Sequence, residues 1–424
     1  MHYVSTRDSS RRLTASQAIV EGLSRDGGLY LPESIPQLTL ADIRALARLS
    51  YPERAAKIMK LYLEEFSEEE LLGFAQKAYG PAKFDTPAAA PVVQLADNTY
   101  IQELWHGPTC AFKDMALQML PYLLTASLKK TGEEKTVCIL VATSGDTGKA
   151  AMEGFCNVPG TKIVVFYPYG GVSAVQQAQM ATQEGDKVDF VVPTGNFGDI
   201  LAGYFAKEMG LPVGRLVCAS NANNVLTEFL RTGRYDRRRP FYKTASPSMD
   251  ILVSSNLERL LYLLSGDDAL VAQLMQQLNE EGAYEVPEDL LAKLRALFWA
   301  GCCDDAGAKA AIGKVWREHH YLCDTHTAVA WDVAQQYKKE NADHNAVVVL
   351  STASPYKFPA AVLEGIGEKA EGDEFDVMEQ LHDVTGVPVP KNLAGLRSRE
   401  VRHRDVIEQG DMLAYVLKRA EKED

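Results

Sequence analysis

Five short apolar segments, separated by residues with helical periodicity, constrain the fold of this chain more than any other feature. The segments are rich in valine and isoleucine and are apolar along their whole length, without the alternation of a half-exposed strand. They are Thr136–Ala142, Lys162–Tyr167, Val188–Val192, Leu216–Ala219 and Ala346–Leu350. Parallel strands that are buried on both faces of a sheet have this composition. Because strands and helices alternate, the sequence predicts a doubly wound, mostly parallel α/β core with right-handed crossovers.

The start of the chain differs from this pattern because its periodicity is mainly helical. Apolar residues recur at helical spacing in Leu40–Leu49 and Tyr51–Tyr79, and the proline- and alanine-rich Thr86–Pro91 is typical of a boundary. The charged segment Asp267–Gly307 also has a helical pattern and indicates an insertion or a helical flank. We therefore predict an N-terminal, mainly helical domain over residues 1–90 and a second domain over 91–424. Within the second domain, residues from about 110 to 190 are expected to form a smaller nested α/β subdomain.

Composition and charge exclude several classes of partner. The net charge is −13, from 44 Lys and Arg against 57 Asp and Glu, so we expect no nucleic-acid partner. The seven cysteines lack the spacing of a metal site and are typical of reduced thiols, so we expect no metal and a cytoplasmic location. No apolar segment is long enough to span a bilayer, and the first residues contain no apolar leader segment, so no membrane association is expected.

A lysine stands between a turn and a helix in the segment Glu103–Gln118. Gly107 and Pro108 form the turn signal, Asp114 adds negative charge to the first helical turn, and apolar residues continue at helical spacing. Lys113, held between this turn and buried neighbours, can have a lowered pKa and form an imine with an aldehyde cofactor. A solvated surface position is the more common alternative for a lone lysine, and these residues alone do not exclude it.

A hydroxyl- and glycine-rich loop follows the first predicted strand and opens a helix. Backbone N–H groups in such a loop can bind an anion, and a substrate carboxylate suits the pocket. An ordinary helix-capping loop explains the same residues equally well. The candidate substrate-binding residues of this loop are Thr143, Ser144, Gly145, Asp146 and Thr147. Ser173, in a loop after the second predicted strand, is a further candidate for substrate contact.

A second glycine-containing loop follows the strand Val188–Val192. Glycines on both sides of Asn-Phe let the backbone wrap a phosphate, and the N-terminus of the following helix adds partial positive charge. The loop contains neither the Lys-Ser/Thr pair of a Walker loop nor the spacing of a dinucleotide loop. Its candidate cofactor-binding residues are Gly195, Asn196, Phe197, Gly198 and Asp199. We expect Asp199 to cap the helix, because its carboxylate would repel a phosphate.

Two further segments contain residues that could contact a bound cofactor or substrate. The strand Ala346–Leu350 ends in Ser351–Phe358, where Thr352 supplies a candidate hydroxyl. Taken alone, this segment is more typical of a strand end with ordinary hydroxyl capping. The polar side chains of Asn256 and Arg259 suit a substrate phosphate, although helix capping and a solvated arginine explain them nearly as well.

These motifs together resemble the threonine synthases, a family of the tryptophan-synthase-β-like superfamily. The matching segments begin with the Asp-Gly-Gly-Leu-Tyr run in Ser24–Glu33 and extend to Phe358. They also include Glu103–Gln118, Thr143–Gly148, Gly195–Asp199, Ser246–Ile251, Ser254–Arg259, Asp324–Ala328 and Ser351–Phe358. The chain departs from the family pattern at Ser354, where a histidine is expected, and at Lys149, where a small residue is expected.

The resemblance implies pyridoxal 5'-phosphate on Lys113, with the cofactor phosphate on Gly195–Asp199 and the ring nitrogen opposite Thr352. It implies O-phospho-L-homoserine as substrate and a role for Lys113 as general base and acid. We expect a monomer or homodimer. It also places the domain over 91–424 among the catalytic domains of pyridoxal-phosphate enzymes. Two alternatives stay open: a phospholyase of the same family that releases 2-oxobutyrate and ammonia, and a non-catalytic regulatory homologue.

Overall fold

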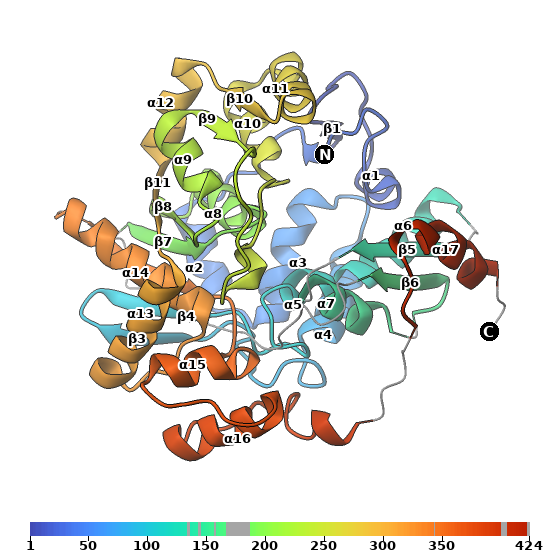
Figure 1. Cartoon of the computed structure of the whole chain (residues 1–424). Coiled ribbons are helices and arrows are strands. Elements are labelled where there is room, and N and C mark those ends of the chain that lie inside the picture. Colours follow the sequence, from blue (N-terminus) through green and yellow to red (C-terminus); the bar gives the residue numbers. More distant parts are fainter. Residues whose placement is uncertain are drawn as a thin grey trace.

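The computed structural model describes residues 1–133, 136–142, 146–156, 158–166, 187–342, 344–399 and 405–421. Its main body is a six-stranded sheet with helices on both faces, beside a smaller two-stranded sheet (Figure 1). None of the helices in these residues is long and apolar enough to cross a membrane.

The main sheet has the strand order β11-β8-β7-β12-β4-β3. Its strands are β3 Val92–Ala96, β4 Thr99–Glu103, β7 Val188–Pro193, β8 Val213–Ser220, β11 Phe298–Cys302 and β12 Ala346–Ser351. All neighbours run parallel except β3, which pairs antiparallel with β4 at the edge. The mostly parallel sheet predicted from the apolar segments is therefore confirmed.

Burial on both faces explains why these strands are apolar along their whole length. In β12, Val347 and Val349 pack into the core on one face of the sheet, whereas Val348 and Leu350 pack into the core on the other. The first face is covered by α13 Asp305–His319, α14 Thr325–Glu340, α15 Pro359–Gly365 and α16 Glu374–Thr385. The second is covered by α8 Gly198–Glu208, α9 Val225–Thr232, α10 Leu257–Ser265, α11 Asp268–Glu280 and α12 Glu288–Leu297.

The smaller sheet consists of β5 Val137–Ala142 and β6 Thr161–Phe166, which pair in parallel. Helix α7 Asp146–Phe155 connects the two strands, as a parallel crossover requires. Helix α6 Leu120–Thr131 packs beside it through Leu124 and Leu128, in one apolar cluster with Phe155. Both strands were expected from their composition.

The N-terminal part is mainly helical, as predicted. It contains α1 Ala15–Glu21, α2 Leu40–Ala47, α3 Tyr51–Tyr62 and α4 Glu68–Tyr79, with β1 Tyr3–Ser5 and β2 Tyr30–Pro32 paired antiparallel. Capping boxes begin α2 at Thr39 and α4 at Ser67, which explains where these helices start. Phe66 and Leu71 form an apolar cluster with Met119, so this part packs directly on the segment that follows Lys113.

The segment Asp267–Gly307 corrects an expectation. It is not purely helical, because α12 leads directly into β11, which extends the main sheet parallel to β8. The short strand β10 Ala283–Glu285 pairs antiparallel with β9 Arg234–Asp236. Strand β11 has the sequence Phe-Trp-Ala-Gly-Cys and contains no β-branched residue, so composition does not distinguish it from the helix before it.

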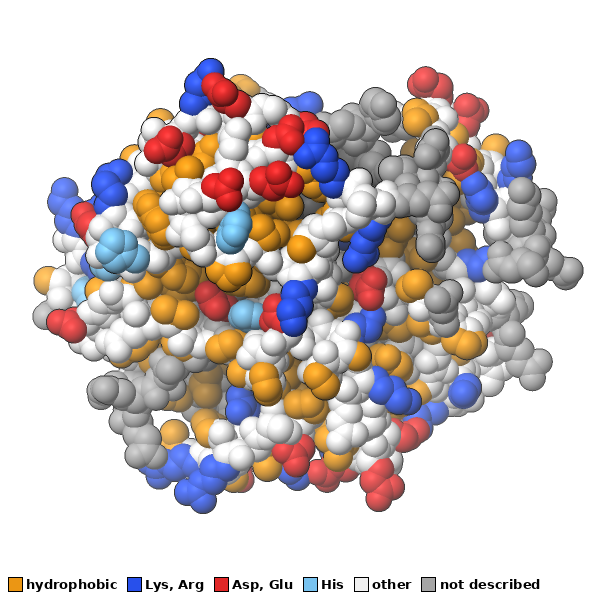
Figure 2. Space-filling view, turned by 90° about the horizontal axis from the view of Figure 1, so that it is seen from below, with side chains coloured by type: hydrophobic (Ala, Val, Ile, Leu, Met, Phe, Trp, Pro, Cys, Tyr) orange, Lys and Arg blue, Asp and Glu red, His pale blue; other side chains and the backbone are white. Residues whose placement is uncertain are grey.

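The remaining described elements are short or lie near the C-terminus. They are α5 Asp114–Leu117, η1 Pro247–Met249, η2 Pro355–Lys357, η3 Leu396–Ser398, η4 Gln409–Asp411 and α17 Met412–Glu421. On the face seen from below, acidic and basic side chains are interspersed with apolar ones (Figure 2). The charge of the described side chains on this face is therefore mixed rather than segregated.

Candidate active site

The turn before Lys113 is built around a buried carboxylate. Asp114 accepts hydrogen bonds from the backbone N–H of Thr109 at 2.8 Å and from the hydroxyl of Thr109 at 2.9 Å. A Cβ on Gly107 would lie 2.5 Å from the Asp114 side chain, so this position requires glycine. Burial raises the pKa of Asp114 to about 6, against these hydrogen bonds and the charge of Lys357. The turn thus holds Lys113 at the start of α5.

Lys113 is half-buried and has unusual electrostatic surroundings. Burial lowers its pKa, and the charge of Lys357 lowers the pKa further. The carboxylates of Asp146, Asp199 and Asp114 act in the opposite direction without cancelling the effect. The predicted direction of the shift is therefore confirmed. A lysine of this kind has a larger neutral fraction near neutral pH than a solvated one, which favours it as a nucleophile and as a base.

Sheet topology brings three predicted segments to one place. Strands β7 and β12 are parallel neighbours, so the loop after β7 and the segment after β12 lie at the same edge of the sheet. Ala353 forms a β-bridge with Ala111, which places the segment after β12 beside the turn of Lys113. Thr352, next to this bridge, is buried. Ser354 accepts a hydrogen bond from the N–H of Tyr356 at 3.3 Å, so it caps η2 where the family pattern has a histidine.

The loop after β7 is held in a shape that suits an anion. The carbonyl of Gly195 accepts from the hydroxyl of Ser254 at 2.8 Å, and the carbonyl of Asn196 accepts from the side chain of Asn256 at 2.9 Å. In a trans peptide the next N–H points away from the carbonyl, so the N–H groups of residues 196 and 197 face away from these partners. Phe197 adopts the left-handed conformation (φ 63°) just before α8 begins at Gly198.

Asp199 lies in the first turn of α8 but forms no capping hydrogen bond. The prediction that it caps the helix is wrong, because the capping position is occupied by Phe197. Its Oδ2 atom is buried and has no hydrogen-bond partner among the described residues. Burial raises the pKa of Asp199 to about 6, while Lys113 acts to lower it. Asp199 therefore interacts electrostatically with Lys113 and has a buried oxygen that a ligand can satisfy.

Asn256 and Arg259 have partners that differ from the predicted ones. Besides its contact with the loop, Asn256 accepts a hydrogen bond from Arg259, whose Nε donates to the carbonyl of Tyr30 at 3.2 Å. Glu258 pairs with Arg7 instead of Arg259. These contacts indicate that Asn256 supports the Gly195–Asp199 loop and that Arg259 holds Asn256 in place. A substrate role for both side chains stays a prediction.

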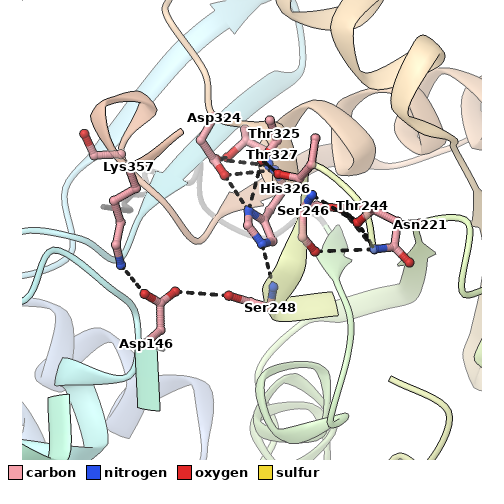
Figure 3. A network of polar contacts seen from close by, with 12 residues as sticks. Asp146, Asn221, Thr244, Ser246, Ser248, Asp324, Thr325, His326, Thr327 and Lys357 are labelled. Carbon is pink, nitrogen blue, oxygen red and sulfur yellow. Dashed lines mark hydrogen bonds and ion pairs between the residues drawn. The ribbon is translucent and has the colours of Figure 1, made fainter. Parts of the chain in front are cut away.

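The predicted substrate loop is only partly within the described residues, because Thr143, Ser144, Gly145 and Ser173 lie outside them. Asp146 and Thr147 begin α7. Asp146 is buried and forms an ion pair with Lys357, and it accepts a hydrogen bond from the hydroxyl of Ser248 at 3.0 Å (Figure 3). Burial raises its pKa, but the charges of Lys357, Lys113 and Lys149 outweigh burial and hold the pKa well below the usual range.

A buried histidine supports Ser248 from the opposite side. The Nδ1 atom of His326 lies 2.8 Å from the carboxylate of Asp324, and its Nε2 accepts from the N–H of Ser248 at 3.1 Å (Figure 3). This assigns the proton to Nδ1 and occupies both nitrogens. His326 thus positions Ser248, in keeping with its omission from the predicted site. Asn221 supports the same loop by donating to Thr244 and Ser246 at 2.8 and 3.1 Å.

Lys357 and Ser248 were not among the predicted site residues. Both belong to segments that resemble family motifs, so they could have been predicted as charged or hydroxyl side chains within a matched motif.

Lys149, three residues after Asp146, is half-buried, and burial together with the charge of Lys357 lowers its pKa to about 8.

The turn of Lys113, the loop after β7 and the hydroxyl of Thr352 therefore lie together at one edge of the main sheet of an α/β protein. Family models for "Threonine synthase N terminus" and "Threonine synthase, C-terminal" match residues 2–79 and 327–414. Threonine synthase of Pseudomonas aeruginosa is 35% identical, over 87% of this chain and 91% of its own length. The chain belongs to the threonine synthase family.

Two solved structures resemble the fold closely. Yeast threonine synthase superposes with a TM-score of 0.85 at 30% identity, over 99% of this chain and 98% of its own. Threonine synthase of Brucella melitensis, solved with bound PLP, has a TM-score of 0.79 at 34% identity, over 89% of this chain and 94% of its own. The predicted α/β fold class is therefore confirmed.

Proposed function

We propose that this chain converts O-phospho-L-homoserine and water to L-threonine and phosphate, the last step of threonine biosynthesis, with pyridoxal 5'-phosphate as cofactor. The observation that carries the proposal is that Lys113, the Gly195–Asp199 loop and Thr352 share one edge of the main sheet. The family to which the chain belongs supports the substrate and the reaction. The activity is that of a carbon–oxygen lyase acting on a phosphate ester.

The residues present fit the cofactor. A Cβ on Gly195 would lie 2.7 Å from the carbonyl oxygen of Ser248, so this loop has no room for a side chain there. The start of α8 adds partial positive charge to the N–H groups of the loop. We propose that Gly195, Asn196, Phe197 and Gly198 hold the cofactor phosphate, as in the resembling motif. Within the described residues, the buried Oδ2 atom of Asp199 has no hydrogen-bond partner. We propose that it accepts from a polar group of the cofactor other than the phosphate.

Lys113 and Thr352 face the reactive part of the ligand in this proposal. The amine of Lys113 would hold the cofactor through its aldehyde group. The hydroxyl of Thr352 would donate to the ring nitrogen and, unlike a carboxylate, would not require that nitrogen to be protonated. When bound, the cofactor supplies an electron sink that stabilises negative charge next to the substrate's α-carbon.

Lys113 also moves protons during the reaction. In its neutral form the amine takes the proton from the substrate's α-carbon, and in its charged form it returns a proton there. Cβ also loses a proton, the C–O bond at Cγ breaks with loss of phosphate, and Cγ gains a proton to become a methyl group. The oxygen of water bonds to Cβ, and the remaining proton of that water leaves with the phosphate. A lowered pKa of Lys113 suits both the removal and the return of this proton, because the neutral and the charged amine are both accessible near neutral pH.

The substrate carboxylate needs a separate site. We propose that the N–H and hydroxyl groups of Thr143, Ser144, Gly145 and Thr147 bind it, with Ser173 nearby. The carboxylate of Asp146 does not bind another carboxylate directly. It serves instead to fix the start of α7 against Lys357 and Ser248, because these contacts span two distant parts of the chain.

Product analysis tests the proposal against its nearest rival. Purified protein with bound cofactor should release L-threonine and phosphate in equal amounts from O-phospho-L-homoserine. Lys113→Ala should abolish this activity and the visible cofactor band. With cofactor removed from both proteins, the variant and the unsubstituted protein should have the same thermal unfolding midpoint. Release of 2-oxobutyrate and ammonia instead would identify a phospholyase. A protein that takes up no cofactor would support a non-catalytic homologue.

A further inference from the structure

His106 lies between two carboxylates, directly before the turn that leads to Lys113. Its Nδ1 atom is 2.5 Å from Oδ1 of Asp85, and its Nε2 atom is 3.2 Å from Oε2 of Glu103. An ionised carboxylate only accepts hydrogen bonds, so both contacts are satisfied when both ring nitrogens carry protons. The ring of Trp105 stacks on the imidazole with the centroids 4.5 Å apart, and an aromatic face also favours a cation. The geometry therefore favours a charged imidazole.

The charged groups that face His106 come from two elements. Asp85 belongs to the connection between α4 and β3, and its backbone N–H also donates to the carbonyl of His106 at 3.0 Å. Glu103 is the last residue of β4. Burial lowers the pKa of His106, but these two carboxylates outweigh burial and raise the pKa to about 9. The ring is therefore charged at neutral pH and loses its proton under alkaline conditions.

Glu103 joins this histidine to a distant segment of the site. Its Oε1 atom accepts a hydrogen bond from the hydroxyl of Tyr321 at 3.0 Å, across 218 residues of sequence. Tyr321 lies in the connection between α13 and α14, three residues before Asp324. Asp324 begins the series of contacts that holds Ser248 in place (Figure 3). The position of Glu103 is thus linked to the support of Ser248.

Glu103 also lies beside the end of β12. In the parallel register of β4 and β12 it is the partner of Ser351, the residue before Thr352. The core residues two positions earlier in each strand belong to the same cluster, so both side chains point to the face of the sheet that is covered by α13 and α14. Glu103 is therefore in contact with, or adjacent to, each segment that leads to Lys113, Thr352 or Ser248.

We propose that charged His106 is a positioning residue for the reaction: by holding Glu103, it keeps the turn of Lys113 and the end of β12 in one arrangement. The inference rests on the proposed function, because the arrangement matters through the roles assigned to Lys113 and Thr352. When the ring loses a proton, one nitrogen faces a carboxylate without a hydrogen to donate. A displacement of reacting groups by about 1 Å can slow a reaction about 100-fold, so the loss should fall on kcat.

The test uses the protein with bound cofactor and follows kcat and KM for O-phospho-L-homoserine between about pH 6.5 and about pH 10. His106→Gln removes the charge, and Glu103→Gln removes one of the carboxylates that hold the proton on the ring. His2→Gln is the matched control, because His2 is exposed and lies 3.5 Å from Glu33 in the N-terminal part. NMR titration of the histidine rings, with the His106 signal assigned by its loss in His106→Gln, gives the pKa of this residue independently.

We expect kcat of the unsubstituted protein to fall as pH rises through about 9, together with the NMR titration of His106. In Glu103→Gln both the fall in kcat and the NMR titration should move to lower pH by the same amount, because one carboxylate no longer favours the charged ring. His106→Gln should lower kcat near neutral pH about 10-fold or more, change KM less, and not show this fall. The cofactor spectrum near neutral pH should be retained in all variants, and His2→Gln should match the unsubstituted protein.

A purely structural ion pair would change the stability of the protein without changing the pH profile of kcat. The inference is overturned if Glu103→Gln moves the NMR titration of His106 but not the profile of kcat. It is also overturned if His106→Gln keeps both kcat and its profile, or if His106 titrates near the ordinary histidine value. Should His106→Gln fail to fold, His106→Asn takes its place in the kinetics and in the NMR assignment.

Failure of the proposed function gives a different result. If the unsubstituted protein forms no L-threonine, the proposed function fails, and the rate at which added L-threonine changes the cofactor spectrum replaces kcat in the same comparison. A pH dependence of this rate that follows His106 would then support the positioning role alone. A cofactor spectrum that does not respond to L-threonine at any pH would overturn both.

Discussion

Replacing Lys357 with methionine tests whether the ion pair with Asp146 joins α7 to the main body of the protein. The two side chains are 211 residues apart in the sequence and are almost fully buried, with 1% and 5% of their side-chain surfaces exposed. Methionine fills a similar volume without a charge. In Lys357→Met, Asp146 keeps its hydrogen bond from Ser248 but loses the ammonium group that it pairs with directly.

The expected loss follows from the burial of both partners. Removing one member of a buried pair costs about 3–5 kcal/mol, because the other charge stays desolvated without compensation. Replacing both members costs less, so Lys357→Met combined with Asp146→Asn should be more stable than either single variant. The coupling energy between the two positions should be about 2–3 kcal/mol in favour of the intact pair.

The pH dependence of unfolding gives a second readout. In the unsubstituted protein the folded pKa of Asp146 is depressed, so its contribution is present above the unfolded pKa and is lost as pH falls through the folded value. In Lys357→Met, less positive charge opposes the effect of burial on Asp146, so the folded-state pKa of Asp146 rises. The destabilisation of Lys357→Met should therefore be largest at neutral pH and should shrink as the pH is lowered toward about 5.

Denaturant unfolding followed by tryptophan fluorescence provides the assay, with cofactor in excess in every sample so that its binding contributes equally. The four proteins of the double-mutant cycle are compared at neutral pH and at about pH 5. Free-energy losses that add without coupling, or a loss for Lys357→Met below about 1 kcal/mol, would refute the assignment of a buried, stabilising pair.

Three further predictions concern the loop after β7 and a histidine beside the site. Gly195→Ala should weaken cofactor affinity about 10-fold or more in a spectroscopic titration, because its Cβ would lie 2.7 Å from the carbonyl oxygen of Ser248. Gly73→Ala in α4, with no atom within 4 Å of the added Cβ, should leave that affinity unchanged. Asn256→Ala should weaken cofactor retention by several-fold and alter the substrate KM less, since its amide donates to the carbonyl of Asn196; the reverse pattern would restore a substrate role. Burial lowers the pKa of His106, but the carboxylates of Asp85 and Glu103 outweigh it and raise the pKa to about 9. The stabilisation of the folded protein by charged His106 is fully present below about pH 6.5 and is lost as pH rises through about 9. Between these pH values the free energy of unfolding should therefore fall by about 2–3 kcal/mol more in the unsubstituted protein than in His106→Gln. Equal pH profiles would contradict the pairing.

The fold was predictable where a strand has a distinctive composition. The Val-rich run of β12 reads as a buried parallel strand, and its alternate side chains pack into the cores on the two faces of the sheet. Strand β11 was not predictable, because Phe298–Cys302 follows a charged helix without a turn and contains no β-branched residue. Its place in the sheet comes from pairing with β8, a contact that local sequence does not encode.

The site was predictable in its loops and less so in its contacts. Parallel strands align their carboxyl ends, so the loop at Gly195 and the hydroxyl of Thr352 could be placed together from topology alone. The partners of Asp146 and Asn256 could not, because they depend on how α7 and the loops around residues 248 and 256 meet in space. The sequence around Asp199 does not distinguish a helix-capping carboxylate, which was expected, from a carboxylate with a buried oxygen that has no partner among the described side chains and backbone groups.

If the proposed function holds, the arrangement of charges explains how one site can contain lysines with different roles. Lys357 is paired directly with Asp146, and a charged ammonium is the form that stabilises this carboxylate. Lys113 is desolvated and lies within the field of Lys357, and both effects favour its neutral form, which is the one that accepts a proton. Asp146 also acts on Lys113, in the opposite direction, so the pair sets the balance between the two protonation states. Neutralising either member of the pair should therefore shift the pH profile of activity, even though neither side chain needs to exchange a proton with the substrate.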